Sequence, residues 1–217
     1  MDKDFWEAHW DEVGARAHGR AAVASPYLSA EIGDLEPGTA LDAGCGEGAE
    51  AVWLAEHGWA VTAVDISARV LARAAEAAAS VGGPGRVRFV EADLGTWEPA
   101  TRFDLVTTHY AHPAMPQLAF YERIAQWVAP GGTLLVVGHL RTGETGAAHA
   151  HGHGHGQGAE DGSPPLEATV TAAAVTATLD PAAWDVVTAA ETTRSLADGA
   201  GEVVELHDVV VRTRRRS

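Results

Sequence analysis

The first two thirds of the chain alternate between short apolar segments and longer segments whose apolar residues are spaced three and four apart. The short segments predict strands near 41–43, 61–65, 86–90, 103–107 and 133–138. The spaced segments predict helices over 47–57, 67–78 and 118–128. This alternation predicts an α/β fold with a mostly parallel sheet, helices on both faces and a ligand site at the carboxyl ends of the strands.

The two ends of the chain differ from this central pattern. Phe5 to Val13 carries aromatic and apolar residues at helical spacing and predicts an N-terminal helix. Near the other end, 169–179 predicts the last helix of the alternating part. Segments 184–192 and 202–212 are separated by a short polar turn and predict an antiparallel hairpin.

Residues 141–165 are rich in glycine, histidine and alanine and contain too few large apolar side chains to build a core. This segment is predicted to be a flexible loop. Four of its histidines alternate with small residues: His149, His151, His153 and His155. They are interpreted as part of a low-complexity linker, with a binding site for Ni²⁺, Cu²⁺ or Zn²⁺ as the alternative, because imidazoles ligate these metals.

Length and composition are those of one α/β domain, and residues 1–217 are treated as a single domain. Cys45 is the sole cysteine, so an intrachain disulfide is excluded and the thiol is interpreted as a small apolar filler. The apolar runs are too short to cross a bilayer, and the charged N-terminus lacks the apolar region of a signal peptide. We therefore expect a cytoplasmic protein without a membrane partner.

The charge balance is strongly acidic, because 30 Asp and Glu residues against 15 Lys and Arg residues give a formal net charge of −15. A surface of this kind repels phosphate backbones, so nucleic acid is not an expected partner. The same charge favours a neutral or cationic small molecule over an anionic one, although a local pocket can override the net charge.

The segment Leu41 to Gly48 places three glycines where a strand must turn into a helix. Glycine tolerates positive φ and lets a ligand approach the backbone, and the following helix offers free N–H groups, so a nucleotide-like ligand is predicted. Asp65 ends the next strand, 21 positions after Gly44, where its two oxygens suit the hydroxyls of a ribose. Gly44, Gly46 and Ala49 also satisfy the dinucleotide pattern, so an NAD-type oxidoreductase stays open on this turn alone.

Three further details favour a different ligand: Asp42 just before the glycine turn, the pair Asp93 and Leu94 at a strand end, and the turn 129–132 before the fifth strand. Together with the glycine turn they resemble the class I S-adenosylmethionine-dependent methyltransferases. Within that superfamily the chain looks like the small tellurite-resistance and thiopurine-methyltransferase-like branch. The matching runs are AGCGEGAEAVWLAEHGWAVTAVDIS, FDLVTTHYAHP and APGGTLLVVGH.

The resemblance runs from about Phe5 to Gly138 and, more weakly, to Arg212. It implies a Rossmann-like sheet of seven strands, with the last strand inserted beside the fifth. It also implies that the N-terminal segment 1–30 covers the cofactor and acceptor, with a helix merely docked on the core as the alternative. The implied function is transfer of a methyl group from S-adenosylmethionine to a small-molecule acceptor at S, O, N or a metalloid. An NAD-type oxidoreductase and a noncatalytic cofactor- or metal-binding protein are the alternatives.

For each part of the cofactor the resemblance implies a contact. The backbone of the glycine turn and Asp42 lie close to the amino-acid end of the cofactor. Asp65 binds the ribose hydroxyls, and Asp93 accepts a hydrogen bond from the adenine amine. Ile66 and Leu94 are implied to lie on either side of the adenine. Turn acids that bind no ligand are the alternative for the last two carboxylates. The full set of expected cofactor residues is Asp42, Gly44, Cys45, Gly46, Asp65, Ile66, Asp93, Leu94 and His109.

Methyl transfer is an in-line displacement, so alignment and exclusion of water supply much of the catalysis. A thiolate or softer nucleophile then needs little help near neutral pH, whereas a hydroxyl or ammonium acceptor must lose a proton to a nearby group. The catalytic candidates are His109, Tyr110 and His112, just beyond the fourth strand, with His139 at the same rim. The resemblance favours a shaping role for Tyr110 and His112, because similar enzymes with different acceptors carry Tyr and His there.

Overall fold

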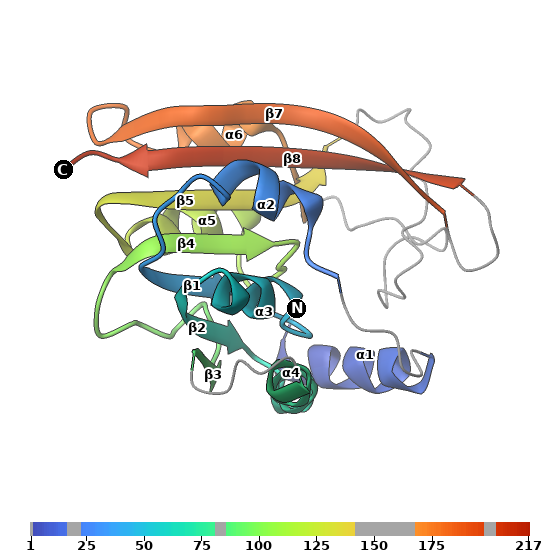
Figure 1. Cartoon of the computed structure of the whole chain (residues 1–217). Helices are drawn as coiled ribbons and strands as arrows, with labels where there is room; N and C mark the ends of the chain where they lie inside the picture. The colour runs from blue at the N-terminus through green and yellow to red at the C-terminus, as the bar shows by residue number, and fades with distance from the viewer. Residues whose placement is uncertain (1, 17–22, 81–85, 142–167, 198–202) are drawn as a thin grey trace.

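An eight-stranded sheet organises the described part of the chain, which in this computed structural model comprises residues 2–16, 23–80, 86–141, 168–197 and 203–217. Seven strands lie in the order β3 (Val87–Glu91), β2 (Ala60–Asp65), β1 (Thr39–Ala43), β4 (Phe103–His109), β5 (Val128–Leu140), β8 (Val203–Arg215) and β7 (Trp184–Ala197) (Figure 1). The first five of these are parallel to one another, which confirms the predicted α/β fold with a mostly parallel sheet.

Alternate side chains of β5 enter two different cores, one on each face of the sheet. Leu134 and Val136 belong to one core, whereas Leu135 and Val137 belong to the other, as the two-residue period of a strand requires. The first core also contains side chains of α5 (Gln117–Ala125) and α6 (Ala172–Ala177). The second contains side chains of α2 (Pro26–Ile32), α3 (Ala49–Glu56) and α4 (Ala68–Ser80). The prediction of helices on both faces is therefore confirmed.

The C-terminal strands form the predicted antiparallel hairpin, with β7 paired along its length to β8. In turn, β8 runs antiparallel to β5, where Val211 lies opposite Val136. The last strand of the chain is thus inserted beside the fifth, as the resemblance implied. Both strands are longer than the predicted segments.

Two predicted helices have different bounds in the structure. The segment 169–179 begins with a short strand, β6 (Thr169–Val170), which pairs with the end of β5. Its helix starts only at α6, because the Thr171 hydroxyl accepts a hydrogen bond from the backbone N–H of Ala174 and caps the first turn. The helix predicted to reach Val128 ends at Ala125, since Val128 pairs with β4 instead.

Other local predictions are confirmed. Ser67 precedes α4, and its hydroxyl accepts a hydrogen bond from the backbone N–H of Val70 at 3.3 Å, which is the expected cap. The N-terminal helix forms as α1 (Lys3–Arg16). None of the described helices is long and apolar enough to span a bilayer.

The predicted loop 141–165 lies outside the described residues from position 142 onward. The same holds for the four alternating histidines, His149, His151, His153 and His155. Treatment of the chain as one domain stays a prediction.

Candidate functional site

The glycine turn lies between the end of β1 and the start of α3, at the carboxyl edge of the sheet. Gly44 and Gly46 have φ values of 80° and 48°, in the left-handed region that favours glycine. A Cβ on Gly44 would lie 2.4 Å from the Cβ of Ala111, in the segment that follows β4. The turn therefore needs glycine both for its backbone angles and for close approach to its neighbours.

Asp65 stands at the end of β2 and is bonded to this turn. One carboxylate oxygen accepts from the backbone N–H of Gly46 at 3.0 Å, and the other accepts from the N–H of Ser67 at 3.0 Å. Burial raises the pKa of Asp65, and these backbone donors act against that rise. Each oxygen has a further lone pair, so the carboxylate can hold the turn and also accept from a hydroxyl.

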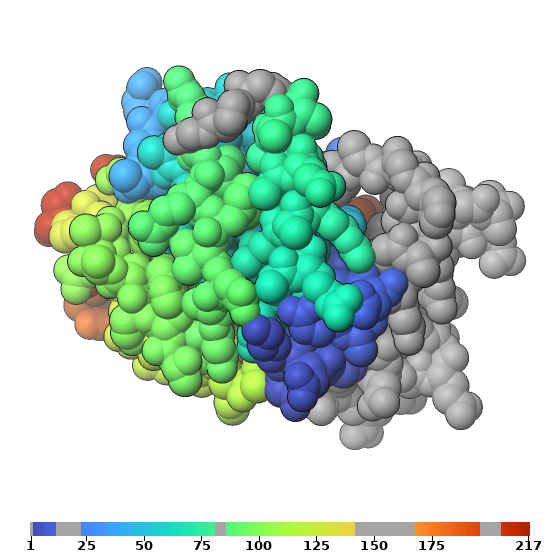
Figure 2. All heavy atoms as spheres, turned by 90° about the horizontal axis from the view of Figure 1, so that it is seen from below, coloured from blue at the N-terminus to red at the C-terminus, as the bar shows by residue number. Residues whose placement is uncertain are grey.

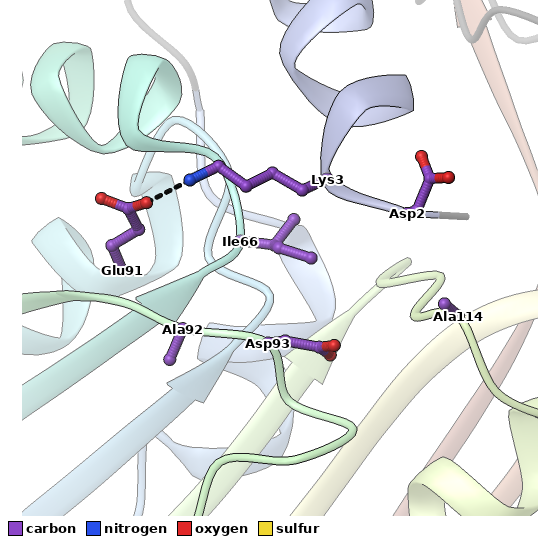
Figure 3. Close-up of a pocket in the computed structure, with 7 residues that line it drawn as sticks. All are labelled: Asp2, Lys3, Ile66, Glu91, Ala92, Asp93 and Ala114. Carbon is purple, nitrogen blue, oxygen red and sulfur yellow. Dashed lines mark hydrogen bonds and ion pairs between the residues drawn. The ribbon is translucent and has the colours of Figure 1, made fainter.

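A cavity of about 290 Å³ opens beside the ends of β2 and β3. Figure 3 shows Ile66 and Asp93 on its wall, with Lys3 reaching across to form an ion pair with Glu91. Asp93 also accepts from the backbone N–H of Gly95 at 2.8 Å, so it is a turn acid as well as a cavity residue. The full lining is Asp2, Lys3, Ile66, Glu91, Ala92, Asp93 and Ala114.

Leu94 is 6% exposed and contributes to one of the cores. Its Cδ1 would lie 4.0 Å from a Cβ on Gly44, so it sits behind the glycine turn. Cys45 is buried in the other core, and burial raises the pKa of its thiol well above the usual value. A raised pKa disfavours the thiolate, which agrees with a packing role for Cys45.

Helix α1 packs against α4, and the two lie side by side on the surface in Figure 2. The Glu7 carboxylate accepts from the backbone N–H of Ala68 at 3.0 Å, and Arg69 pairs with both Glu7 and Asp11. The Trp10 ring lies 3.4 Å from where a Cβ on Gly46 would be. This placement over the turn and the cavity favours the interpretation of α1 as a cover.

Asp42 is the most buried carboxyl of the site, at 1% exposure, and its Oδ2 has no hydrogen-bond partner. Burial raises its pKa well above the ordinary value, and the charges of Glu50 and Asp65 raise it further. A buried oxygen of this kind, beside a turn without side chains, fits a ligand that brings its own positive charge or N–H donor.

His109 ends β4 with a side chain only 5% exposed. Its Nε2 lies 2.9 Å from the Thr107 hydroxyl, and its Nδ1 lies 3.9 Å from Glu50 Oε1 without a hydrogen bond. Burial lowers the pKa of His109, so the neutral ring is favoured. Glu50 also accepts from the backbone N–H of Ser25 at 2.9 Å.

Tyr110 and His112 meet His139 at the neighbouring rim of the sheet. The ring centroids of Tyr110 and His139 are 4.9 Å apart, and those of His112 and His139 are 5.2 Å apart and stacked. The Tyr110 hydroxyl donates to Asp208 at 2.8 Å. Tyr110 and His112 are thus brought together with His139, whereas the His109 ring lies against Thr107 and Glu50. Tyr110 directs its hydroxyl to a carboxylate of β8.

Sequence reasoning missed Glu50 and Asp208. Glu50 carried a signal, because it is an acid in the first turn of the helix that follows the glycine turn. Asp208 carried none, since it lies within a strand that also carries the polar residues Glu205 and His207. Among the described residues no group of three or more His, Cys, Asp or Glu is placed to hold a metal ion.

The sequence is similar to those of known methyltransferases. A family model described as "Methyltransferase domain" matches residues 40–132. Trans-aconitate 2-methyltransferase of Streptomyces avermitilis is 36% identical over 115 residues, which cover 49% of this chain and 42% of the relative. A probable thiol methyltransferase of Arabidopsis thaliana is 31% identical over 137 residues, which cover 61% and 60%.

The matched segments therefore span only about half the length of these curated relatives. Among solved structures, magnesium protoporphyrin IX methyltransferase of Synechocystis with bound SAH aligns with a TM-score of 0.67. That alignment covers 99% of this chain and 98% of the other at 16% identity, so it shows a common fold.

Proposed function

We propose that the chain is a class I methyltransferase of the thiopurine-methyltransferase-like kind, which transfers a methyl group from S-adenosylmethionine to a small-molecule acceptor. The observation that carries this proposal is the glycine turn bonded to Asp65 beside a cavity lined by Ile66 and Asp93. All of these residues lie inside the matched segment 40–132. The relatives named above are methyltransferases, which favours this function over an NAD-type oxidoreductase.

The residues present fit the cofactor at Asp42, whose buried Oδ2 lacks a hydrogen-bond partner that an ammonium group would provide. We assign the adenine to the cavity at Ile66 and Asp93, the ribose hydroxyls to Asp65, and the amino-acid end to the region of Asp42. When bound, the cofactor supplies an electrophilic methyl group on a sulfonium.

The protein's own contribution is then to bind, orient and exclude water. Helix α1 covers the turn, and the ion pairs of Arg69 with Glu7 and Asp11 hold that helix on α4. The Nε2 of His109 is bonded to Thr107 and its Nδ1 has no hydrogen-bond partner, so we assign Nδ1 as the ring nitrogen that would contact an acceptor. The Tyr110 hydroxyl is occupied by Asp208, so we assign Tyr110 a shaping role rather than a base role.

We propose a thiol or another soft nucleophile as the preferred class of acceptor. Such an acceptor needs little help in losing a proton near neutral pH, and the Tyr110 hydroxyl and the His109 Nε2 are engaged in other contacts. One relative is named a thiol methyltransferase, which supports this choice. Hydroxyl, amine and metalloid acceptors are the alternatives.

Calorimetry tests the cofactor assignment directly. The protein should bind S-adenosylhomocysteine with a Kd in the micromolar range and should not bind NADH. Tight binding of NADH together with indifference to S-adenosylhomocysteine would overturn the proposal. Cofactor binding without product, in a screen of thiols, hydroxyls and amines, would instead support the noncatalytic alternative.

Metal binding by His149, His151, His153 and His155 is a separate proposal, to which the described residues lend no support. Deleting residues 147–158 and titrating with zinc and nickel decides it, because unchanged affinity would leave the segment a linker. Cytoplasmic residence likewise stays a prediction.

A further inference from the structure

A buried carboxylate outside the proposed cofactor contacts joins three segments that are distant in the sequence. Asp208 of β8 is 0% exposed. Its Oδ1 accepts from the Tyr110 hydroxyl at 2.8 Å, and its Oδ2 accepts from the Tyr27 hydroxyl at 3.0 Å. Arg194 of β7 donates its Nε to the same Oδ2 at 2.7 Å and supplies the opposite charge. Both oxygens of this buried carboxylate are therefore bonded.

Tyr110 has an unusual backbone. Its φ is 54°, and it is the one non-glycine residue with positive φ in the described part of the chain. A residue with a Cβ keeps this conformation only when its surroundings hold it there. The backbone N–H of Tyr110 donates to the carbonyl of Val137 at 2.9 Å, and its hydroxyl accepts from Arg194 at 3.3 Å besides donating to Asp208.

Burial raises the pKa of the Tyr110 hydroxyl, and the charge of Asp208 raises it further. For Tyr27 the same causes, in the same order, raise the pKa to about 12. Both hydroxyls therefore keep their protons at neutral pH and remain donors to the carboxylate.

The turn at Tyr110 sets the direction of the chain where β4 enters the site. His109 precedes it, and Ala111 follows it directly onto the glycine turn, where the space beside Gly44 is closed by the Ala111 Cβ. The Ala111 carbonyl accepts from the Gln117 side chain at 2.8 Å, which fixes the far end of the turn. Holding Tyr110 thus holds one wall of the proposed site for the amino-acid end of the cofactor.

We propose that Asp208 is a positioning residue, which holds Tyr110 in its left-handed conformation and thereby sets His109 and Ala111 against the glycine turn. The inference rests on the proposed function, because it predicts an effect on cofactor affinity. Asp208 acts through Tyr110 and lies outside the assigned cofactor contacts. Its hydrogen bond to Tyr110 connects the C-terminal hairpin to the segment that carries the catalytic candidates.

Tyr110→Gly provides the decisive test, since glycine adopts positive φ without an anchor. Asp208→Asn places an NH₂ group opposite hydrogen-bond donors that the carboxylate accepts from in the wild type. The Kd of S-adenosylhomocysteine should rise by about tenfold, because the left-handed conformation of Tyr110 is then no longer held. Tyr110→Gly should stay within about threefold of the wild type, and the double variant Asp208→Asn/Tyr110→Gly should recover to the Tyr110→Gly value. Calorimetry at a temperature well below each melting transition gives all four values.

Two matched variants separate positioning from general loss of structure. Tyr27→Phe removes a hydroxyl from the same carboxylate but leaves the turn alone, so its Kd should change by less than about twofold. Asp104→Asn alters the opposite end of β4, where Asp104 accepts from the N–H and hydroxyl of Thr39 at 2.8 Å, and should lower the melting temperature without changing Kd. If Asp208→Asn does not fold, Tyr110→Phe takes its place and should weaken binding, because it removes the bonded hydroxyl alone.

A wild-type Kd in Asp208→Asn, or in Tyr110→Phe if that variant replaces it, would overturn the inference. A double variant as weak as Asp208→Asn would also overturn it, since the carboxylate would then act by some route other than the turn. A wild-type protein that does not bind S-adenosylhomocysteine would overturn the proposed function and this inference with it.

Discussion

The carboxylate of Asp65 accepts a hydrogen bond from the backbone N–H of Gly46 at 3.0 Å, and so joins the end of β2 to the middle of the glycine turn. Its other oxygen accepts from the N–H of Ser67 at the start of α4. The residue proposed to bind the ribose and the turn proposed to bind the cofactor are therefore joined by a hydrogen bond. A change at Asp65 should alter stability and affinity together.

Replacing Asp65 with Ala should raise the Kd of S-adenosylhomocysteine at least about tenfold and destabilise the protein by about 1–3 kcal/mol, because two backbone donors lose their acceptor. Calorimetry and thermal unfolding measure the two effects. Asp104→Ala is the matched control, since it also removes two hydrogen bonds, both from Thr39, but at the opposite edge of the sheet. Affinity that survives Asp65→Ala would remove this residue from the cofactor site.

Replacing Gly44 with Ala should destabilise the protein by about 1–3 kcal/mol more than Gly131→Ala, through overpacking. Both glycines have nearly the same φ, 80° and 79°, so the backbone strain is matched. The added Cβ would meet Ala111 at 2.4 Å in the first case but only the Ser217 hydroxyl at 3.5 Å in the second. Chemical denaturation gives the difference, and Ala111→Gly should relieve it in the double variant. Equal losses for the two glycines would mean that close approach to Ala111 is unimportant.

Asp42 should make stability depend on pH. Burial raises its pKa above the unfolded value of 3.8, so the folded state binds this proton more tightly than the unfolded state does. The resulting stabilisation is complete below pH 3.8 and is lost as pH rises through the folded-state pKa. Asp42→Asn removes the charge at every pH and should therefore raise the melting temperature more at pH 8 than at pH 5.

The same substitution should weaken binding of S-adenosylhomocysteine, because the buried acceptor for its amino group loses its charge. For the melting temperature, Asp104→Asn at an exposed position serves as the comparison, and its melting temperature should not rise at pH 8. A larger gain at pH 5 than at pH 8 would mean that folding does not raise the pKa of Asp42.

His109 and His112 are tested by separate Ala variants once an acceptor is found. If one of them is a base, its loss should lower kcat for a hydroxyl or amine acceptor by about a hundredfold or more, and have little effect on a thiol. Initial rates with the two acceptor classes provide the measurement. A residue whose replacement leaves turnover unchanged with both classes takes no part in the mechanism.

Much of the fold follows from signals between residues close in sequence. Strand and helix periods, the Ser67 cap and the glycines at 44 and 46 depend on local backbone preferences, and each is found where the sequence predicts it. The errors occurred where long-range pairing competed with a local signal. Val128 has helical spacing with α5, yet it pairs with Phe103 in the sheet. The roles of the predicted site residues stay predictions.

By itself, the amino-acid sequence determined the alternating α/β pattern, the glycine turn and the carboxylate that follows it, since each depends on neighbours along the chain. Only the tertiary structure decided which distant groups meet. Asp208 is 98 positions from Tyr110 and 181 positions from Tyr27, yet one carboxylate bonds both. These contacts arise because β8 is inserted beside β5, and sheet order is set by burial and hydrogen bonding of the whole chain rather than by any local pattern.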